Sequence, residues 1–355
     1  MRESYGEQPH NPYAVDPTSG DASVGEPALG EPALGESAIG ESAIGESPGA
    51  VGREDLPPSP VGRDRPRIWP SLLLPLISLV AFLLSSLVMM VVAFYVVHGE
   101  FSPRMMVSAE AMQTVSASRV GLLLLVVAPQ LALVLPTLIA AALSPVGFSK
   151  RLSLVRGHWP LWAWVAAALT TPLIGFISSI AVGSLMEESE SLKMMSDIFR
   201  GHGETGFLIP LAILIGATPA FCEEFLFRGY VQTRLNRRIG PALGIFLSSA
   251  LFAVFHMDLI HIIAVFPLGV YLGVIAWRSA SLIPAMLGHF VNNSISVFAV
   301  VLGPETQDQD PSPEMALFLL VVIGLGLLGA LLTAVAMWRL PVPPPVRLTP
   351  EPAVS

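Results

Sequence analysis

The apolar part of this sequence concentrates its ionisable side chains in one region. They interrupt apolar runs between residues 207 and 302 and comprise Glu223, Glu224, Arg228, His256, Asp258, His261 and His289. A charge in the hydrocarbon of a bilayer costs at least about 2.5–3.5 kcal/mol on insertion scales, so such residues normally face a cavity or one another. Their clustering predicts that the helices carrying them surround a single polar site.

Two adjacent glutamates, Glu223 and Glu224, stand within an apolar run and are followed by Arg228. On a helix, Glu224 and Arg228 are four residues apart and share a face, so they can form an ion pair. Glu223 points about 100° away and has no such local partner, which suits a general base that activates a water molecule. The alternative is a buried Glu224–Arg228 clamp that only packs helices together.

Two further motifs contain histidine. His256 ends an apolar run with Phe252 one turn before it, and alone it is most simply an interfacial histidine. His289 and Asn293 are four residues apart on one helical face, with Asn292 as the alternative partner, so an imidazole and a carboxamide can address one point. Such donors can stabilise an oxyanion, although they can equally form a hydrogen bond that joins two helices.

The other reactive side chains in this region are not assigned a role. His256, Asp258 and His261 do not have a recognised metal-ligand spacing, and we interpret Asp258 and His261 as bystanders. Cys222 is the one cysteine of the chain, and the carboxylates beside it oppose formation of a thiolate. It is therefore expected to pack, and a single cysteine excludes intramolecular disulfides and cysteine-based zinc clusters.

Taken together, the motifs resemble those of the CPBP family, the CAAX proteases and bacteriocin-processing membrane proteins that are also called Abi. The matching elements are Glu223-Glu224-x-x-x-Arg228, Phe252-x-x-x-His256 and His289-x-x-x-Asn293, within roughly residues 207–300. The resemblance implies hydrolysis of a peptide bond inside the membrane. It implies that Glu223 activates a water with help from His256, that His289 and Asn293 hold the oxyanion, and that Glu224 and Arg228 orient the motif helix.

The resemblance leaves the cofactor open, because the family is often described as metalloproteases. A zinc ion held by Glu223, His256 and His289 is one alternative. The sequence has no His-Glu-x-x-His motif, and asparagine is a poorer zinc ligand than histidine or cysteine, so we favour a metal-free glutamate mechanism.

Two other functions could use the same polar residues. A transporter is one, but no second copy of the three motifs suggests a duplicated half; a non-catalytic membrane scaffold is the other.

The elements that position these residues are predicted from composition. Hydrophobic residues make up 53% of the chain and charged residues 13%, against about 25% charged in soluble domains. A span needs about 20 apolar residues, and eight candidates are present: 69–97, 120–143, 159–186, 207–230, 239–255, 259–277, 281–302 and 315–338. The expected fold is all-α, a polytopic membrane helix bundle of about eight transmembrane helices within residues 68–340.

Loop charges predict the orientation of the bundle. If the N-terminus lies inside, the inner loops and tail carry Lys150, Arg151, Arg156, Arg234, Arg237, Arg238, Arg278, Arg339 and Arg347. The outer loops also carry three basic residues, Arg104, Lys193 and Arg200, but acidic residues outnumber them there, namely Glu187, Glu188, Glu190, Asp197, Glu204, Glu305, Asp308, Asp310 and Glu314. This asymmetry follows the positive-inside rule. It favours an even number of spans with both termini in the cytoplasm, and we expect a bacterial inner membrane.

The two ends of the chain have a different composition. Residues 1–67 are polar and contain the repeats GEPAL, GEPAL, GESAI, GESAI and GESPG, which predict a disordered cytoplasmic tail. Residues 341–355 form a Pro-rich tail. The first apolar run is too long and too late for a cleavable signal peptide. The expected partners are the lipid bilayer and a membrane-associated or lipidated peptide substrate, and there is no basic stripe for nucleic acid.

Overall fold

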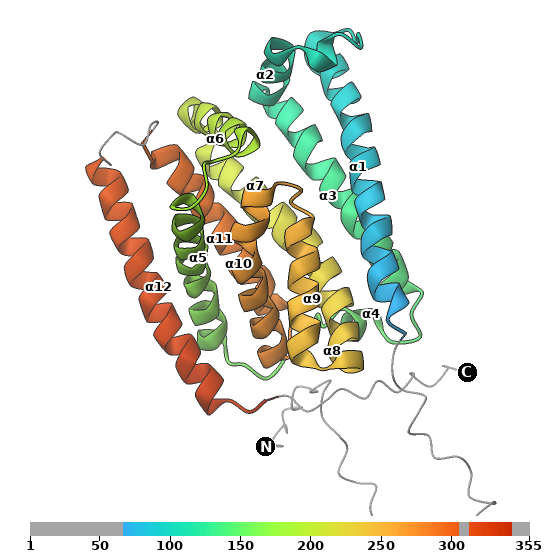
Figure 1. Ribbon diagram of the computed structural model, residues 1–355, viewed down its shortest axis with the longest axis vertical. Coiled ribbons are helices and arrows are strands. Elements are labelled where there is room, and N and C mark those ends of the chain that lie inside the picture. Colours follow the sequence, from blue (N-terminus) through green and yellow to red (C-terminus); the bar gives the residue numbers. More distant parts are fainter. Residues whose placement is uncertain (1–66, 305–311, 343–355) are drawn as a thin grey trace, which may run out of the picture. The chain divides into compact units, whose positions relative to one another are not determined.

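The computed structural model describes residues 67–304 and 312–342 of the chain, and these residues form helices and no strands (Figure 1). Seven helices are long and apolar enough to cross a membrane by length and composition. They are α1 (Trp69–His98), α3 (Arg119–Ala142), α5 (Leu161–Gly183), the helical stretch Glu190–Ile239, α10 (Leu259–Ser279), α11 (Ile283–Leu302) and α12 (Pro313–Arg339). The expected all-α membrane bundle is confirmed, whereas the tails expected at 1–67 and 341–355 fall almost entirely outside the described residues.

The outward faces of the long helices are apolar. On α1, Leu76, Leu84 and Val88 are all exposed, and on α12, Leu320 and Leu331 are exposed in the same way. A soluble monomer rarely presents contiguous apolar surface over whole helices. These faces therefore fit the hydrocarbon of a bilayer, and the chain is an integral membrane protein.

The span expected at 239–255 is shorter than a membrane-crossing helix. It forms α9 (Pro241–Val254), whose 14 residues extend only about 21 Å, against the roughly 30 Å of a hydrocarbon core. Gly240, with a φ of 89°, and Pro241 interrupt the helix between α8 (Thr233–Ile239) and α9. Because α9 is short, the turn that follows it lies within the depth of the bundle and not beyond it.

Some segments expected to be loops are helical. The structure contains α2 (Ala109–Ala117), α4 (Phe148–Arg151) and the amphipathic α6 (Glu190–His202), together with a 3-10 turn at Met105–Val107. Serine side chains cap α2, α3 and α6 by accepting a hydrogen bond from a backbone N–H of the first turn. Polar caps of this kind allow helices to begin directly after short connections.

The long stretch from α6 to α8 is not one regular helix. It runs through a π-helical turn, η3 (Gly203–Phe207), then α7 (Leu208–Glu224), then a π-helix, η4 (Phe225–Gln232), before α8. Within η3, Gly206 has a φ of 74°, so the chain direction changes there. The span expected at 207–230 corresponds to α7 together with most of η4.

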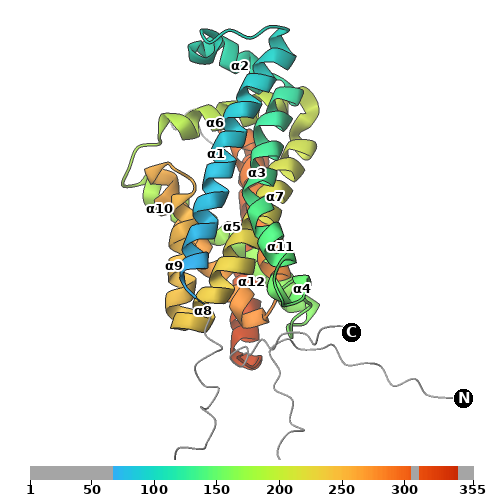
Figure 2. The same ribbon diagram turned by 90° about the vertical axis from the view of Figure 1, so that its right-hand side faces the viewer.

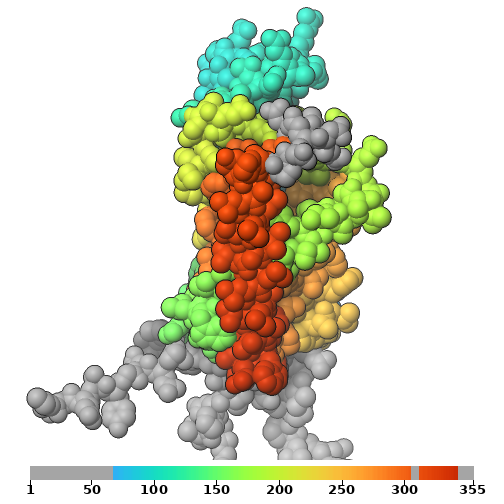
Figure 3. Space-filling model, turned by 90° about the vertical axis from the view of Figure 1, so that its left-hand side faces the viewer, coloured from blue at the N-terminus to red at the C-terminus, as the bar shows by residue number. Residues whose placement is uncertain are grey.

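The helices pack in pairs around α7 and α11. α1 lies along α3, α12 lies along α5, and α9 lies along α10, while α11 contacts both α7 and α5 (Figures 1 and 2). Figure 3 shows α12 as a column on the outside of the bundle, flanked by the amphipathic α6. The segments carrying the ionisable residues, from α7 to α11, therefore lie against one another in the interior.

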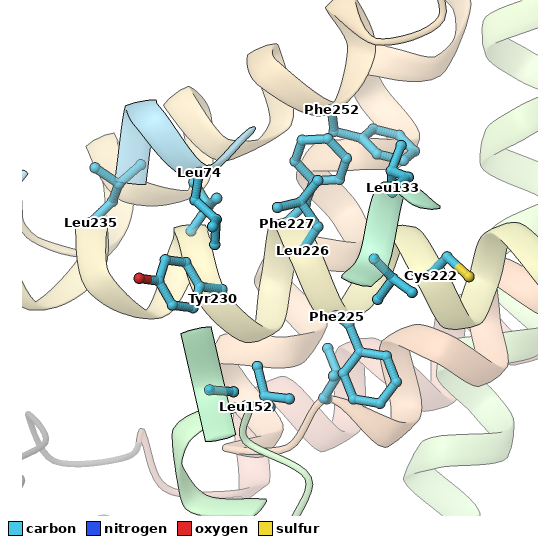
Figure 4. Packing of buried hydrophobic residues seen from close by; sticks show 14 residues of the cluster. Leu74, Leu133, Leu152, Cys222, Phe225, Leu226, Phe227, Tyr230, Leu235 and Phe252 are labelled. Atoms are coloured by element: carbon cyan, nitrogen blue, oxygen red, sulfur yellow. The ribbon is translucent and has the colours of Figure 1, made fainter. Parts of the chain in front are cut away.

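The main apolar core gathers around η4 (Figure 4). Phe225, Leu226 and Phe227 are buried there with Leu133 from α3 and Phe252 from α9. Cys222 is also a buried member of this cluster, in keeping with the packing role expected for it. The cluster fixes the end of α7, where the two glutamates stand, against α3 and α9.

Candidate active site

Glu223 and Glu224 are the last two residues of α7, and the π-helix η4 begins immediately after them. Pro219 lies within the preceding turn of α7 and cannot donate a helical hydrogen bond. Single π-helical segments inside α-helices occur frequently at functional sites. The two carboxyl groups thus occupy a point where the regular helix is interrupted on both sides.

Glu224 forms the buried ion pair expected from the four-residue spacing. Arg228 Nη1 donates to Glu224 Oε1 at 2.6 Å, and neither side chain is exposed to solvent. The same Oε1 lies 3.0 Å from His289 Nδ1 on α11. One carboxylate therefore joins α7, η4 and α11.

Arg228 has two further contacts that hold its guanidinium in place. Its Nη2 donates to the carbonyl of Gly269 on α10 at 2.9 Å, and its guanidinium carbon lies 4.3 Å from the ring centroid of Phe252. A Cβ on Gly269 would lie 3.0 Å from Phe252 and 3.4 Å from Arg228 Nη2, so a larger residue would crowd this approach. These contacts support an orienting role for Glu224 and Arg228.

Glu223 is directed toward a different partner. Its Oε1 accepts a hydrogen bond of 2.9 Å from Gln130 Nε2 on α3, and its Oε2 lies 4.0 Å from His289 Nε2. Oε2 is buried and has no hydrogen-bond partner within the described part of the chain. Glu223 therefore keeps one oxygen free to accept a proton, beside an imidazole nitrogen.

A cavity of about 220 Å³ opens beside Glu223. Its lining combines ionisable and apolar side chains and consists of Phe82, Gln130, Leu133, Glu223, Phe255, His256, Met257 and His261. A volume of this size holds several water molecules, each of which occupies about 30 Å³ in the liquid. The cavity is the place where a water molecule can meet the Glu223 carboxylate.

His256 lies in the turn after α9 and lines the same cavity. Its Nδ1 lies 3.1 Å from the carbonyl oxygen of Phe252, which can only accept, so Nδ1 is the protonated nitrogen. In the neutral ring, Nε2 then carries the lone pair and accepts hydrogen bonds. His256 and Glu223 therefore line one cavity, and the catalytic role expected for His256 stays a prediction.

Two residues interpreted as bystanders contact the site. The His261 ring centroid lies 4.5 Å from that of His256, and His261 lines the cavity from the first turn of α10. Asp258 caps α10 by accepting from the His261 backbone N–H at 2.9 Å, and it accepts from Ser191 on α6 at 2.7 Å. Hydrogen bonds from Ser189, His261 and Ser191 lower the pKa of the Asp258 carboxyl to about 2. Asp258 thus ties α6 to the turn that carries His256.

The side chain of Asn293 lies close to α7 and contacts the backbone of that helix. Its Nδ2 lies 3.4 Å from the carbonyl of Ile215 on α7, and its Oδ1 accepts from Asn292 Nδ2 at 3.1 Å. Asn292 is buried, and its Oδ1 has no hydrogen-bond partner among the described residues. Neither amide is part of the cavity lining given above, so a contact between Asn293 and a substrate oxyanion remains a prediction.

The proposed zinc ligands do not form a metal site. Within residues 67–304 and 312–342, no group of three or more His, Cys, Asp or Glu side chains is placed to hold a metal ion. Glu223 and His289 lie near each other, with Glu223 Oε2 4.0 Å from His289 Nε2, but His256 does not complete a ligand group with them as the side chains are placed.

Gln130 was not identified from the sequence, and its contact with Glu223 leads to a prediction. A Gln130→Leu variant is expected to lose at least about tenfold in turnover of any reaction that uses Glu223, because a hydrogen bond to a charged group contributes about 1.5–3 kcal/mol. Steady-state kinetics of the purified variant would measure the change, which should appear in kcat more than in KM.

Gln232 offers a matched control for that variant. It is a buried glutamine whose Nε2 donates to the backbone carbonyl of Gly273 at 2.8 Å, and not to an acidic side chain. Gln232→Leu should lower the melting temperature while leaving turnover of the folded protein unchanged. Equal turnover for Gln130→Leu and the wild type would show that Gln130 does not position Glu223.

A comparison with protein-family models matches residues 205–295 to the family described as type II CAAX prenyl endopeptidase, Rce1-like. No curated protein and no solved structure matches the chain. The matched segment begins in η3 and ends in α11, so it includes Glu223, Glu224, Arg228, His256, His289 and Asn293. It agrees closely with the roughly 207–300 expected from the three motifs, and it excludes α3, which supplies Gln130.

Proposed function

We propose that this chain is an intramembrane endopeptidase, because residues 205–295 match the model of the type II CAAX prenyl endopeptidase family, Rce1-like, and lie within a bundle of membrane helices. Its substrate is a membrane-associated or lipidated peptide. The observation that carries the proposal is the cavity that Glu223 and His256 share inside the bundle. A carboxylate and an imidazole that face one cavity large enough for water can form a general-base site.

In the proposed reaction, a water molecule in the cavity donates a proton to Glu223 Oε2 and attacks the carbonyl carbon of the scissile peptide bond. The lone pair on His256 Nε2 orients that water. When the tetrahedral intermediate collapses, Glu223 returns the proton to the leaving amine. Gln130 holds the other Glu223 oxygen through these steps and restricts the carboxylate to one orientation.

His289 is proposed to stabilise the oxyanion. Its Nδ1–H donates to the Glu224 carboxylate, so Nε2 can donate a hydrogen bond only when the imidazole is protonated. The protonated ring would be balanced by Glu223, and Arg228 balances Glu224. An imidazolium between two carboxylates presents its free N–H where negative charge develops. Asn293, one turn along α11, is proposed to assist after a small rotation of its amide.

Both termini are proposed to lie in the cytoplasm, because the basic residues gather in the loops at one end of the helices. A leader peptide or another membrane-proximal segment is the proposed substrate if the source is bacterial. A transporter and a scaffold are the alternatives, since both could use the same buried network.

The test is cleavage by the full-length protein in lipid nanodiscs. Membrane-anchored peptides with and without a prenyl group are incubated with the wild type and with His289→Ala, and the products are identified by mass spectrometry. We expect cleavage by the wild type and a loss of at least about a hundredfold in the variant, as for removal of an oxyanion donor. Absence of cleavage of every peptide by folded wild type, together with solute flux into proteoliposomes, would favour the transporter.

A further inference from the structure

A cluster of cationic side chains lies away from the Glu223 cavity, where the end of α4 and the start of α8 both approach Tyr230. Arg151 is the last residue of α4, and Arg234 lies in the first turn of α8. Their guanidinium carbons lie 5.1 Å and 4.4 Å from the ring centroid of Tyr230. Two cations therefore share one aromatic side chain.

Arg151 is buried without an anionic partner. Only 5% of the residue is exposed, and its Nε and Nη2 are buried and have no hydrogen-bond partner in the described structure. The Nε of Arg234 is also buried and has no hydrogen-bond partner among the described residues. The guanidinium of Arg228, by contrast, is fully buried and paired with Glu224. Burial of one partnerless cation is costly, so the Arg151 position calls for an anion from outside the described residues.

The pKa of Arg151 agrees with this geometry. Burial lowers the pKa of its guanidinium, and the nearby Tyr230 opposes that effect only in part. No carboxylate contributes to the shift. The described residues therefore stabilise the charged Arg151 guanidinium less than a bound anion would.

The surroundings indicate which anion fits. Guanidinium groups match the oxygens of phosphate with several N–H donors at once. Beside Tyr230, the core cluster contains the apolar side chains of Leu74, Leu152 and Leu235 (Figure 4). Leu74 is buried in this cluster, whereas its neighbours Leu72 and Leu73 on α1 are exposed and apolar, so a ligand with both a phosphate and hydrocarbon chains suits the site. Anionic lipids of the cytoplasmic leaflet are attracted to basic pockets of this kind.

We propose that Arg151 and Arg234 bind the phosphate group of an anionic phospholipid, with Tyr230 between the lipid and the bundle interior. The two guanidinium groups donate to the phosphate oxygens, and the acyl chains extend along the exposed apolar face of α1, which contacts η4 and includes Leu72, Leu73 and Leu76. The site is separate from the proposed peptidase cavity, and the proposal does not depend on that activity.

The experiment measures lipid binding to the full-length protein in detergent by native mass spectrometry and by thermal unfolding. The probes are phosphatidylglycerol, phosphatidylcholine and inorganic phosphate. We expect phosphatidylglycerol to raise the melting temperature of the wild type, and we expect Arg151→Gln and Arg234→Gln each to weaken its binding about tenfold. Arg156→Gln is the matched control, because Arg156 is exposed in the loop after α4.

Other results would overturn the proposal. Equal binding of phosphatidylcholine and phosphatidylglycerol would show that the headgroup charge is not recognised. Inorganic phosphate binding as tightly as phosphatidylglycerol would show a free-phosphate site instead of a lipid site. Unchanged phosphatidylglycerol binding in Arg234→Gln would exclude this pair of cations, and that variant can be tested even if Arg151→Gln fails to fold, because Arg234 is only partly buried.

Discussion

A Glu223→Gln variant is expected to lose peptidase activity by at least about a thousandfold, near the upper part of the range for loss of a general base. The substitution keeps the shape of the side chain and leaves a carbonyl oxygen that can still accept from Gln130. It removes the oxygen that takes the proton of the attacking water. The loss should therefore appear in kcat, measured with the peptide that the wild type cleaves best, while substrate binding is retained.

Glu190→Gln is the control for that variant, since Glu190 is an exposed acid on α6. It should retain full activity. The Glu223→Gln protein should unfold at the same temperature as the wild type or slightly above it, because a buried acid has been neutralised. Activity within about tenfold of the wild type in a correctly folded Glu223→Gln protein would contradict the general-base role.

The parts of this site that follow local rules could be predicted from the sequence. Glu224 and Arg228 are four residues apart, and helical geometry alone places them together, as the 2.6 Å contact confirms. The membrane bundle followed from apolar runs in the same way. Both predictions depend only on distances along one helix.

Contacts that depend on packing could not be predicted. Gln130 lies 93 residues before Glu223, and a single glutamine in a span can satisfy itself in several ways, so nothing in its neighbourhood identified its partner. Pro129, directly before it, interrupts the backbone hydrogen bonds of α3 and was the one local signal. The partner of such a residue is decided by which helix packs against it.

The position of His261 beside His256 depends on the turn between them. The sequence places His261 five residues after His256, which does not fix where its ring lies. In the structure, Met257 adopts a φ of 55°, and the His261 ring lies edge-on to the His256 ring. The length of α9 also determines where His256 lies. A helix of 14 residues ends inside the bundle, so His256 lies at the level of the cavity.

The largest expected effect on stability comes from Arg228→Met. The substitution leaves Glu224 buried with no countercharge except the His289 imidazole, and removal of one partner of a buried ion pair costs about 3–5 kcal/mol. We expect a sharp fall in yield and melting temperature in detergent, and loss of activity. Arg238→Met is the control, because Arg238 is exposed on α8.

The double variant Glu224→Gln/Arg228→Met separates the structural role of the pair from its role in the reaction. Replacing both partners of a buried pair by neutral side chains is often nearly neutral for stability. The double variant should therefore recover most of the melting temperature lost in Arg228→Met. Activity should stay low, because a glutamine at position 224 accepts from His289 but does not balance the positive charge that the imidazole needs to donate to the oxyanion. Recovery of both stability and activity would show that Glu224 and Arg228 act only as a clamp between helices.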